Sequence, residues 1–193
     1  MDYCRTVLLP LSFDIIAVFE TWFHPAFTDK MAEIKGYSLV RNDRQGRSSG
    51  GVALYIKSHI PFKILSSSKD TGVDKLPEYL ICEVTFLNTQ IMVAVVYRPP
   101  DHQLSYSTDF LDIISSTALN YNSKVILGDF NVNMSYFHSQ SLINFLIFYL
   151  KIIFISFLMV KPTEDPLPIL LKRSPSPFTS SPISPNFLML STK

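Results

Sequence analysis

The sequence is poor in several residue types, and each shortage excludes a class of protein. Its 193 residues include only two cysteines, Cys4 and Cys82, which lie far apart, so a disulfide scaffold and a zinc finger are excluded. Six glycines without a triplet period exclude collagen. Charged residues make up only 17%, and the net charge of +1 argues neither for nor against nucleic acid. Hydrophobic residues make up 47%, which excludes a chain that is disordered throughout.

The first residues lack the order of a signal peptide. The apolar run at residues 8–11 is too short for the hydrophobic core of such a peptide, and no charged stretch of the usual kind precedes it. Two cysteines in the whole chain also favour a reducing compartment. We therefore expect a nuclear or cytoplasmic location rather than secretion.

The composition changes near residue 140. Residues 1–140 carry 12 Lys+Arg against 14 Asp+Glu, a net charge of −2, whereas residues 141–193 carry 5 against 2, a net charge of +3. The end of the chain is rich in proline and serine, a composition typical of disordered segments. We predict a globular domain over 13–140, an apolar segment over 141–161 and a disordered tail over 162–193.

The apolar run at residues 141–160 has two interpretations. It is long enough to cross a bilayer, and its only charge is Lys151. A lysine near the middle of a span costs about 2.5–3.5 kcal/mol on insertion scales. The run is therefore either a membrane contact or a buried helix and strand of the domain, and the sequence leaves both open.

The predicted domain alternates short apolar strands with helical segments. Residues 78–86 and 90–97 form a predicted hairpin around the turn at 87–89. The other predicted strands cover 13–18, 37–40, 52–56 and 124–127, the predicted helices cover 24–35 and 107–121, and a polar, Gly-rich loop covers 42–51. Mixed strands with helices between them predict an α/β or α+β layered domain.

Polar side chains follow three of these strands. Glu20 after the first is either a ligand-binding group at the rim of a sheet or a helix cap. Tyr97 and Arg98 either hold a phosphate, whose oxygens match a guanidinium, or simply end a strand. Asp129 and Asn131 either orient a water molecule near a divalent metal or form an Asx-rich turn.

Four strings of the sequence, in order, resemble the endonuclease/exonuclease/phosphatase superfamily, and within it the endonuclease domain of non-LTR retrotransposons. The string FDIIAVFETW at 13–22 resembles that domain's DIIALTETW, and GGVALY at 50–55 resembles its GGVALY. YRPP at 97–100 and ILGDFN at 126–131 resemble its YRPP and LGDFN. The likeness covers residues 13 to 133, and four strings in the right order make it specific.

The resemblance implies a fold, a reaction and a set of roles. The family fold is an α/β sandwich of two mixed sheets flanked by helices, and the implied reaction is hydrolysis of a DNA phosphodiester without a small organic cofactor. Glu20 matches the glutamate that holds Mg²⁺ or Mn²⁺, and Tyr97 matches a tyrosine that contacts the scissile phosphate. Asp129 matches the aspartate that orients or deprotonates the attacking water, and Asn131 matches the asparagine that supports it.

Two of the family's usual features are missing from the sequence. None of the twelve residues before Phe13 is asparagine, and no histidine stands in a Ser-Asp-His string. We therefore expect a domain that is incomplete at both ends, with unpaired sheet edges and weak or no activity. The alternatives are the same fold acting on another phosphate ester, and a membrane-associated product that is not an enzyme.

Overall fold

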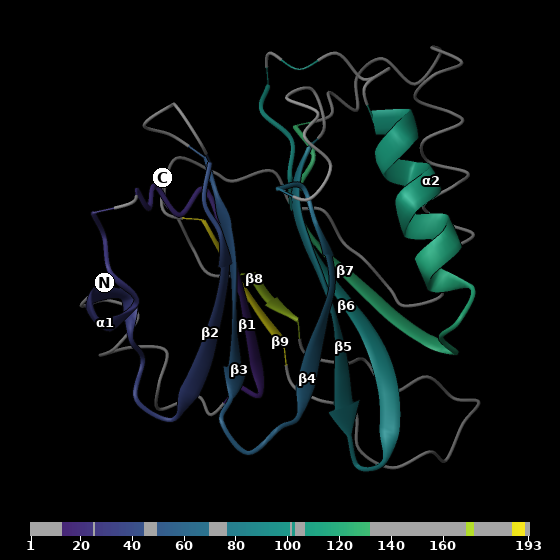
Figure 1. The fold of residues 1–193 in the computed structure, drawn as a ribbon, viewed down its shortest axis with the longest axis horizontal. Helices are drawn as coiled ribbons and strands as arrows, with labels where there is room; N and C mark the ends of the chain where they lie inside the picture. The colour runs from purple at the N-terminus through teal and green to yellow at the C-terminus, as the bar shows by residue number, and fades with distance from the viewer. Residues whose placement is uncertain are drawn as a thin grey trace.

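In the described part of the chain, the computed structural model has two β-sheets that pack face to face, with one helix outside each sheet (Figure 1). The structure describes residues 13–24, 26–44, 50–69, 77–100, 102, 107–131, 169–171 and 187–191. This arrangement confirms the predicted α/β sandwich of two sheets flanked by helices.

The first sheet has five strands in the order β2-β3-β1-β9-β8. These are β1 (Ile15–Phe19), β2 (Tyr37–Asn42), β3 (Val52–Lys57), β8 (Ile169–Leu171) and β9 (Phe187–Ser191). β3 pairs antiparallel with both β1 and β2, whereas β9 pairs parallel with β1 and antiparallel with β8. β1 therefore has a partner on each side.

The second sheet has four strands in the order β4-β5-β6-β7. These are β4 (Phe62–Ser67), β5 (Glu78–Phe86), β6 (Thr89–Tyr97) and β7 (Ser123–Asp129). β5 and β6 form the predicted hairpin, and β7 returns parallel to β6 after the helix α2 (Ser107–Ala118). Sequence analysis missed β4, whose pairing with β5 shifts register between Ile64 and Ser66.

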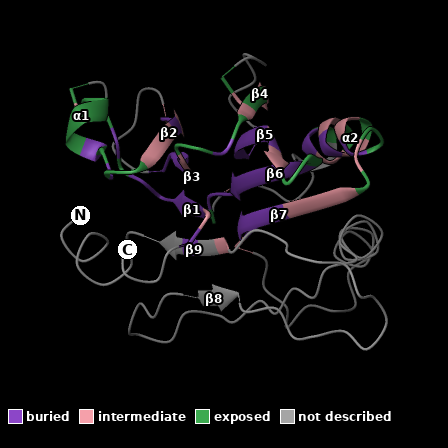
Figure 2. Cartoon of the chain, turned by 90° about the horizontal axis from the view of Figure 1, so that it is seen from below, coloured by how far each residue is buried: buried purple, intermediate pink, exposed green. Residues whose placement is uncertain are grey.

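Period-2 alternation divides the apolar side chains among three layers of packing. In β1, Ile15, Ala17 and Phe19 point into the core between the sheets, and Ile16 and Val18 point to the outer face. The side chains that pack under α2 come from both the helix and the second sheet; they include Phe110, Ile114, Tyr79, Ile81, Met92 and Ala94. Nearly continuous burial along the central strands is visible in Figure 2.

The first helix is much shorter than predicted. The sequence predicted a helix over 24–35, but among the described residues of that range the helix is limited to α1 (Asp29–Ala32), and Thr28 before it has an extended backbone. The predicted helix over 107–121 is confirmed in its main part, since α2 ends at Ala118. In Figure 1, α1 lies outside the first sheet and α2 lies outside the second.

Eight residues of the range 162–193, predicted to be disordered, form the strands β8 and β9. β9 pairs with β1, and β8 pairs with β9, and such long-range pairing is not revealed by a local composition. The apolar run 141–160 lies outside the described residues, and within the described ranges no helix is long and apolar enough to cross a membrane. The division at residues 140 and 161 stays a prediction.

Candidate active site

The ends of β1, β6 and β7 bring the predicted site residues together. Tyr97 is the last residue of β6 and stands beside Asp129, the last residue of β7, in the parallel register. Across the sandwich, the Tyr97 hydroxyl donates a hydrogen bond to Oε1 of Glu20, the residue that follows β1. Three predicted site residues from two sheets are therefore gathered at one edge of the sandwich.

Glu20 is held in an unusual backbone conformation. It is 2% exposed and has a φ of 54°, in the left-handed region that non-glycine residues seldom adopt. The chain that follows is bonded to the start of β3, because the N–H groups of Thr21 and Trp22 donate to the carbonyls of Gly51 and Gly50, at 3.2 and 2.9 Å. Such a conformation persists where the surroundings determine it, and it is typical of functional sites.

The two glycines of the GGVALY string are needed for this close approach. A Cβ on Gly50 would lie 2.6–2.7 Å from the Glu78 carboxylate oxygens, and a Cβ on Gly51 would overlap Oγ1 of Thr21. Both glycines also have positive φ, at 97° and 87°. The string therefore positions the backbone next to Glu20.

Glu78 is a site residue that sequence analysis missed. It begins β5 directly opposite Tyr97, accepts a hydrogen bond from the Gly51 N–H and forms an ion pair with Nε of Arg44 at 2.9 Å. Burial raises the pKa of its carboxyl, and the charge of Glu20 raises it further, against the lowering effects of Gly51 and Arg44. The one feature of the sequence that could have indicated Glu78 as a site residue is that a glutamate stands at the first position of an apolar strand.

The Tyr97 phenol remains a proton donor in this environment. Burial raises its pKa above the usual range, and the hydrogen bond to Glu20 together with the negative charges of Glu20, Glu78 and Asp129 raises it further. A phenol surrounded by carboxylates keeps its proton, because phenolate would add another negative charge there. Tyr97 can therefore donate a hydrogen bond to a carboxylate or phosphate oxygen.

The loop after β7 fixes the carboxylate of Asp129. Its Oδ1 accepts a hydrogen bond from the backbone N–H of Asn131 at 2.8 Å, and Asn131 has a φ of 45°. Phe130, between them, is 1% exposed and packs under the second sheet. Gly128 allows the backbone of β7 to lie close to that of β6 before the loop, since a Cβ on Gly128 would overlap the carbonyl of Val96.

Arg98 bonds the same loop to the end of β6. Its side chain donates to the carbonyls of Phe130 and Asn131, each at 2.5 Å, and to that of His102. Its backbone N–H donates to Asp129, and its carbonyl accepts from Nδ2 of Asn131, both at 2.8 Å. The phosphate contact expected of Arg98 stays a prediction.

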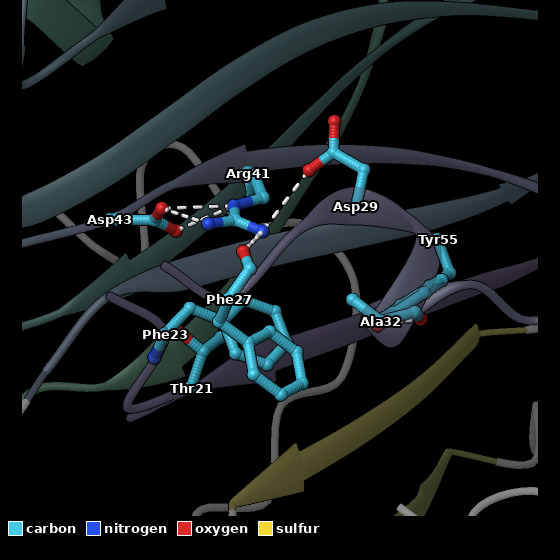
Figure 3. Close-up of polar contacts among 8 residues, drawn as sticks. All are labelled: Thr21, Phe23, Phe27, Asp29, Ala32, Arg41, Asp43 and Tyr55. Carbon is cyan, nitrogen blue, oxygen red and sulfur yellow. Dashed lines mark hydrogen bonds and ion pairs between the residues drawn. The ribbon is translucent and has the colours of Figure 1, made fainter. Parts of the chain in front are cut away.

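A second arginine supports the segment after Glu20. Figure 3 shows Arg41 of β2 donating to the Asp43 carboxylate, to Asp29 at 3.1 Å and to the carbonyl of Phe27 at 2.7 Å. Its guanidinium also lies 5.1 Å above the centre of the Phe23 ring. These contacts attach the segment between β1 and α1 to the first sheet.

The oxygen donors at the site suit a hard divalent cation, although they form no complete cage. Within the described ranges, no group of three or more His, Cys, Asp or Glu side chains is placed to hold a metal ion. Mg²⁺ commonly binds through one or two carboxylates and keeps several waters or substrate phosphate oxygens as its other ligands. Glu20, with Asp129 nearby, is compatible with that mode of binding.

The sequence matches the profile of the Endonuclease/Exonuclease/phosphatase family over residues 1–180. The chain belongs to this family. Its members generally use divalent metal ions and share a phosphodiesterase and phosphatase fold. None of the curated proteins compared with the chain matches it significantly.

Solved structures with TM-scores just above 0.5 share the fold at low sequence identity. A humanized D. rerio TDP2 is 16% identical with a TM-score of 0.52, over 74% of this chain and 57% of that one. A Bacteroides thetaiotaomicron mannosyl-6-phosphatase is 15% identical with a TM-score of 0.52, over 71% and 57%. The endonuclease domain of the retrotransposon TRAS1 is 11% identical with a TM-score of 0.44, over 62% and 53%. The chain thus spans a little over half of each.

Proposed function

We propose that the protein is a divalent-metal-dependent DNA endonuclease of retrotransposon origin with low turnover. The observation that carries the proposal is the meeting of Glu20, Tyr97 and Asp129 at one edge of the sandwich, joined by the hydrogen bond between Tyr97 and Glu20. The choice of DNA is supported by the YRPP and LGDFN strings, whose resemblance is to retrotransposon endonucleases.

Each residue has a role that its surroundings allow. Glu20 would hold Mg²⁺ or Mn²⁺, which supplies positive charge against a phosphate oxygen when bound. Asp129, fixed by the Asn131 N–H, orients the attacking water and accepts its proton. Tyr97 keeps its proton, and its single O–H, which donates to Glu20 in the free protein, would turn to donate to a phosphate oxygen as negative charge builds up there.

We expect low turnover because the sequence lacks one of the strings that the family usually has. The sequence has no Ser-Asp-His string, whose histidine, by the resemblance, would stabilise the charge of the phosphorane-like transition state. Losing one such group typically costs about 10²–10³-fold in rate. The proposal therefore expects slow nicking that depends on the residues already gathered at the site.

Nicking of supercoiled plasmid by the purified chain, with Mg²⁺, Mn²⁺ or EDTA, tests the proposal. Asp129→Asn should abolish metal-dependent nicking, while Asp112→Asn, a change at an exposed position of α2, should leave it unchanged. Circular dichroism confirms that both variants fold. Nicking that persists in Asp129→Asn, or a folded wild-type chain that never nicks, contradicts the proposal.

A parallel assay distinguishes the alternative substrate class. Phosphoinositides and sugar phosphates are offered under the same metal conditions, with release of inorganic phosphate as the measurement. Phosphate release that is lost in Asp129→Asn, in a chain that leaves plasmid intact, would assign the same site to another phosphate ester.

A further inference from the structure

We propose that Arg98 is a positioning residue, which sets the orientation of the Asp129 carboxylate through Asn131 rather than by touching substrate. The inference rests on the proposed function for its kinetic consequence, but its structural part holds for the folded chain by itself. It assigns Arg98 a role different from the phosphate contact that its strand-end position suggested.

The first observation is where the guanidinium points. Arg98 is 5% exposed, and its Nε, Nη1 and Nη2 all donate to backbone carbonyls, those of Phe130, His102 and Asn131. A planar guanidinium presents several N–H donors in a rigid fork, so one side chain can bond to three carbonyls at once. A residue used in this way has its donors directed into the protein.

The second observation is that the bonding is reciprocal. Arg98 donates to the Asn131 carbonyl, and Nδ2 of Asn131 donates back to the Arg98 carbonyl at 2.8 Å. The Arg98 N–H also donates to the Asp129 carbonyl, where the parallel pairing of β6 and β7 ends. Three consecutive residues are therefore bonded to Arg98, the last residue of β7 and the two that follow it.

The third observation is the conformation of Asn131. Its φ of 45° lies in the left-handed region, which costs energy in a residue with a side chain. The same conformation directs its N–H onto Oδ1 of Asp129 at 2.8 Å. By holding Asn131 in place, Arg98 keeps that N–H on the carboxylate that would accept a proton from water.

Arg98→Lys is the decisive variant, because lysine keeps the positive charge and loses the planar fork. Amide hydrogen exchange, followed by NMR on the protein without substrate, measures the Asn131 N–H directly. We expect at least tenfold faster exchange at Asn131 in Arg98→Lys, with unchanged exchange at core amides of β5. Lys124→Met, which removes a charge from β7, is the control and should leave Asn131 unchanged.

Nicking kinetics distinguish positioning from phosphate binding. A positioning role predicts that Arg98→Lys lowers kcat about tenfold or more with KM nearly unchanged. A phosphate contact predicts instead that KM rises in Arg98→Met and recovers in Arg98→Lys.

The outcomes separate this inference from the proposed function. Unchanged Asn131 exchange in Arg98→Lys overturns the positioning role, whether or not the wild type nicks DNA. Recovery of wild-type kinetics by Arg98→Lys overturns it as well. Faster Asn131 exchange in a chain without nuclease activity would support the positioning role and contradict the proposed function.

Discussion

The Tyr97 hydroxyl donates a hydrogen bond to the Glu20 carboxylate, and this contact joins the ends of two strands from different sheets. The two residues are 77 positions apart, and both are almost completely buried, at 4% and 2% exposure. A hydrogen bond to a charged group in such surroundings is worth more than one at the surface. The contact therefore supports both the sandwich and the arrangement of the candidate site.

Replacing Tyr97 by phenylalanine tests this contact. The ring remains in the core while the donor to Glu20 is lost, so the free energy of unfolding should fall by about 1–3 kcal/mol. Urea denaturation measures the change. Tyr121→Phe is the matched control, because Tyr121 donates to Glu83 at 2.6 Å from a less buried position. A loss in Tyr97→Phe no larger than in the control would contradict the prediction.

The glycine at position 51 is predicted to tolerate alanine less well than the glycine at position 36. Both have φ near 88°, so an alanine costs about 1–2 kcal/mol at either place. At Gly36 nothing lies within 4 Å of the added Cβ, whereas at Gly51 it overlaps Oγ1 of Thr21. Gly51→Ala should therefore lose at least about 1 kcal/mol more in thermal or urea unfolding.

The same glycine pair has a consequence for activity. Displacing Thr21 moves the residue next to Glu20, so Gly51→Ala should reduce metal-dependent nicking, while Gly36→Ala should not. The comparison is made at a temperature where both variants are fully folded. Equal nicking rates in the two variants would show that the backbone at Thr21 does not position Glu20.

The turn of the β5–β6 hairpin offers a stabilising substitution. Leu87 and Asn88 both have positive φ, at 47° and 66°, as a two-residue type I′ turn requires. Leu87 is also 63% exposed, so its side chain contributes little packing. Leu87→Asn should raise the free energy of unfolding by about 0.5–1 kcal/mol, whereas Leu119→Asn, at an exposed position after α2, should change it by less. A lowered urea midpoint in Leu87→Asn would contradict the turn assignment.

Stability should fall in alkaline solution. Burial raises the pKa of the Cys82 thiol from 9.0 to about 12, and burial with the hydrogen bond to Glu83 raises that of Tyr121 from 10.0 to about 12. The folded state therefore holds these protons more tightly than the unfolded state. Their contribution is fully present below pH 9 and is lost as pH rises from about 9 to 12.

Urea midpoints at pH 8 to 11 measure this dependence. Cys82→Ala should flatten the slope most clearly between pH 8 and 9, because the thiol, with the lowest unfolded-state pKa of these groups, ionises first in the unfolded state. This holds even though the variant is less stable throughout. The same slope in wild type and Cys82→Ala would mean that the thiol is not the group responsible.

Local pattern determined much of the fold. The apolar runs that became β1, β2, β3, β5, β6 and β7 could be identified because strand formation follows short-range alternation and burial. The order of the polar residues along the chain was equally local, so Glu20, Tyr97, Asp129 and Asn131 could be named from the strings that contain them. Whether these four residues act as predicted stays a question for the nicking assay.

Tertiary structure decided what depends on residues distant in the chain. Three contacts join segments that are too far apart in the sequence for a local pattern to show. β9 lies beside β1, and Glu78 is buried against Gly51 and Arg44. Tyr97 donates its hydrogen bond to Glu20. The direction of the Arg98 guanidinium is of the same kind, because the carbonyls of Phe130 and Asn131 reach it only through the parallel pairing of β6 and β7. The sequence alone determined which chemical groups stand at the strand ends, and the packing of the two sheets decided which of them meet.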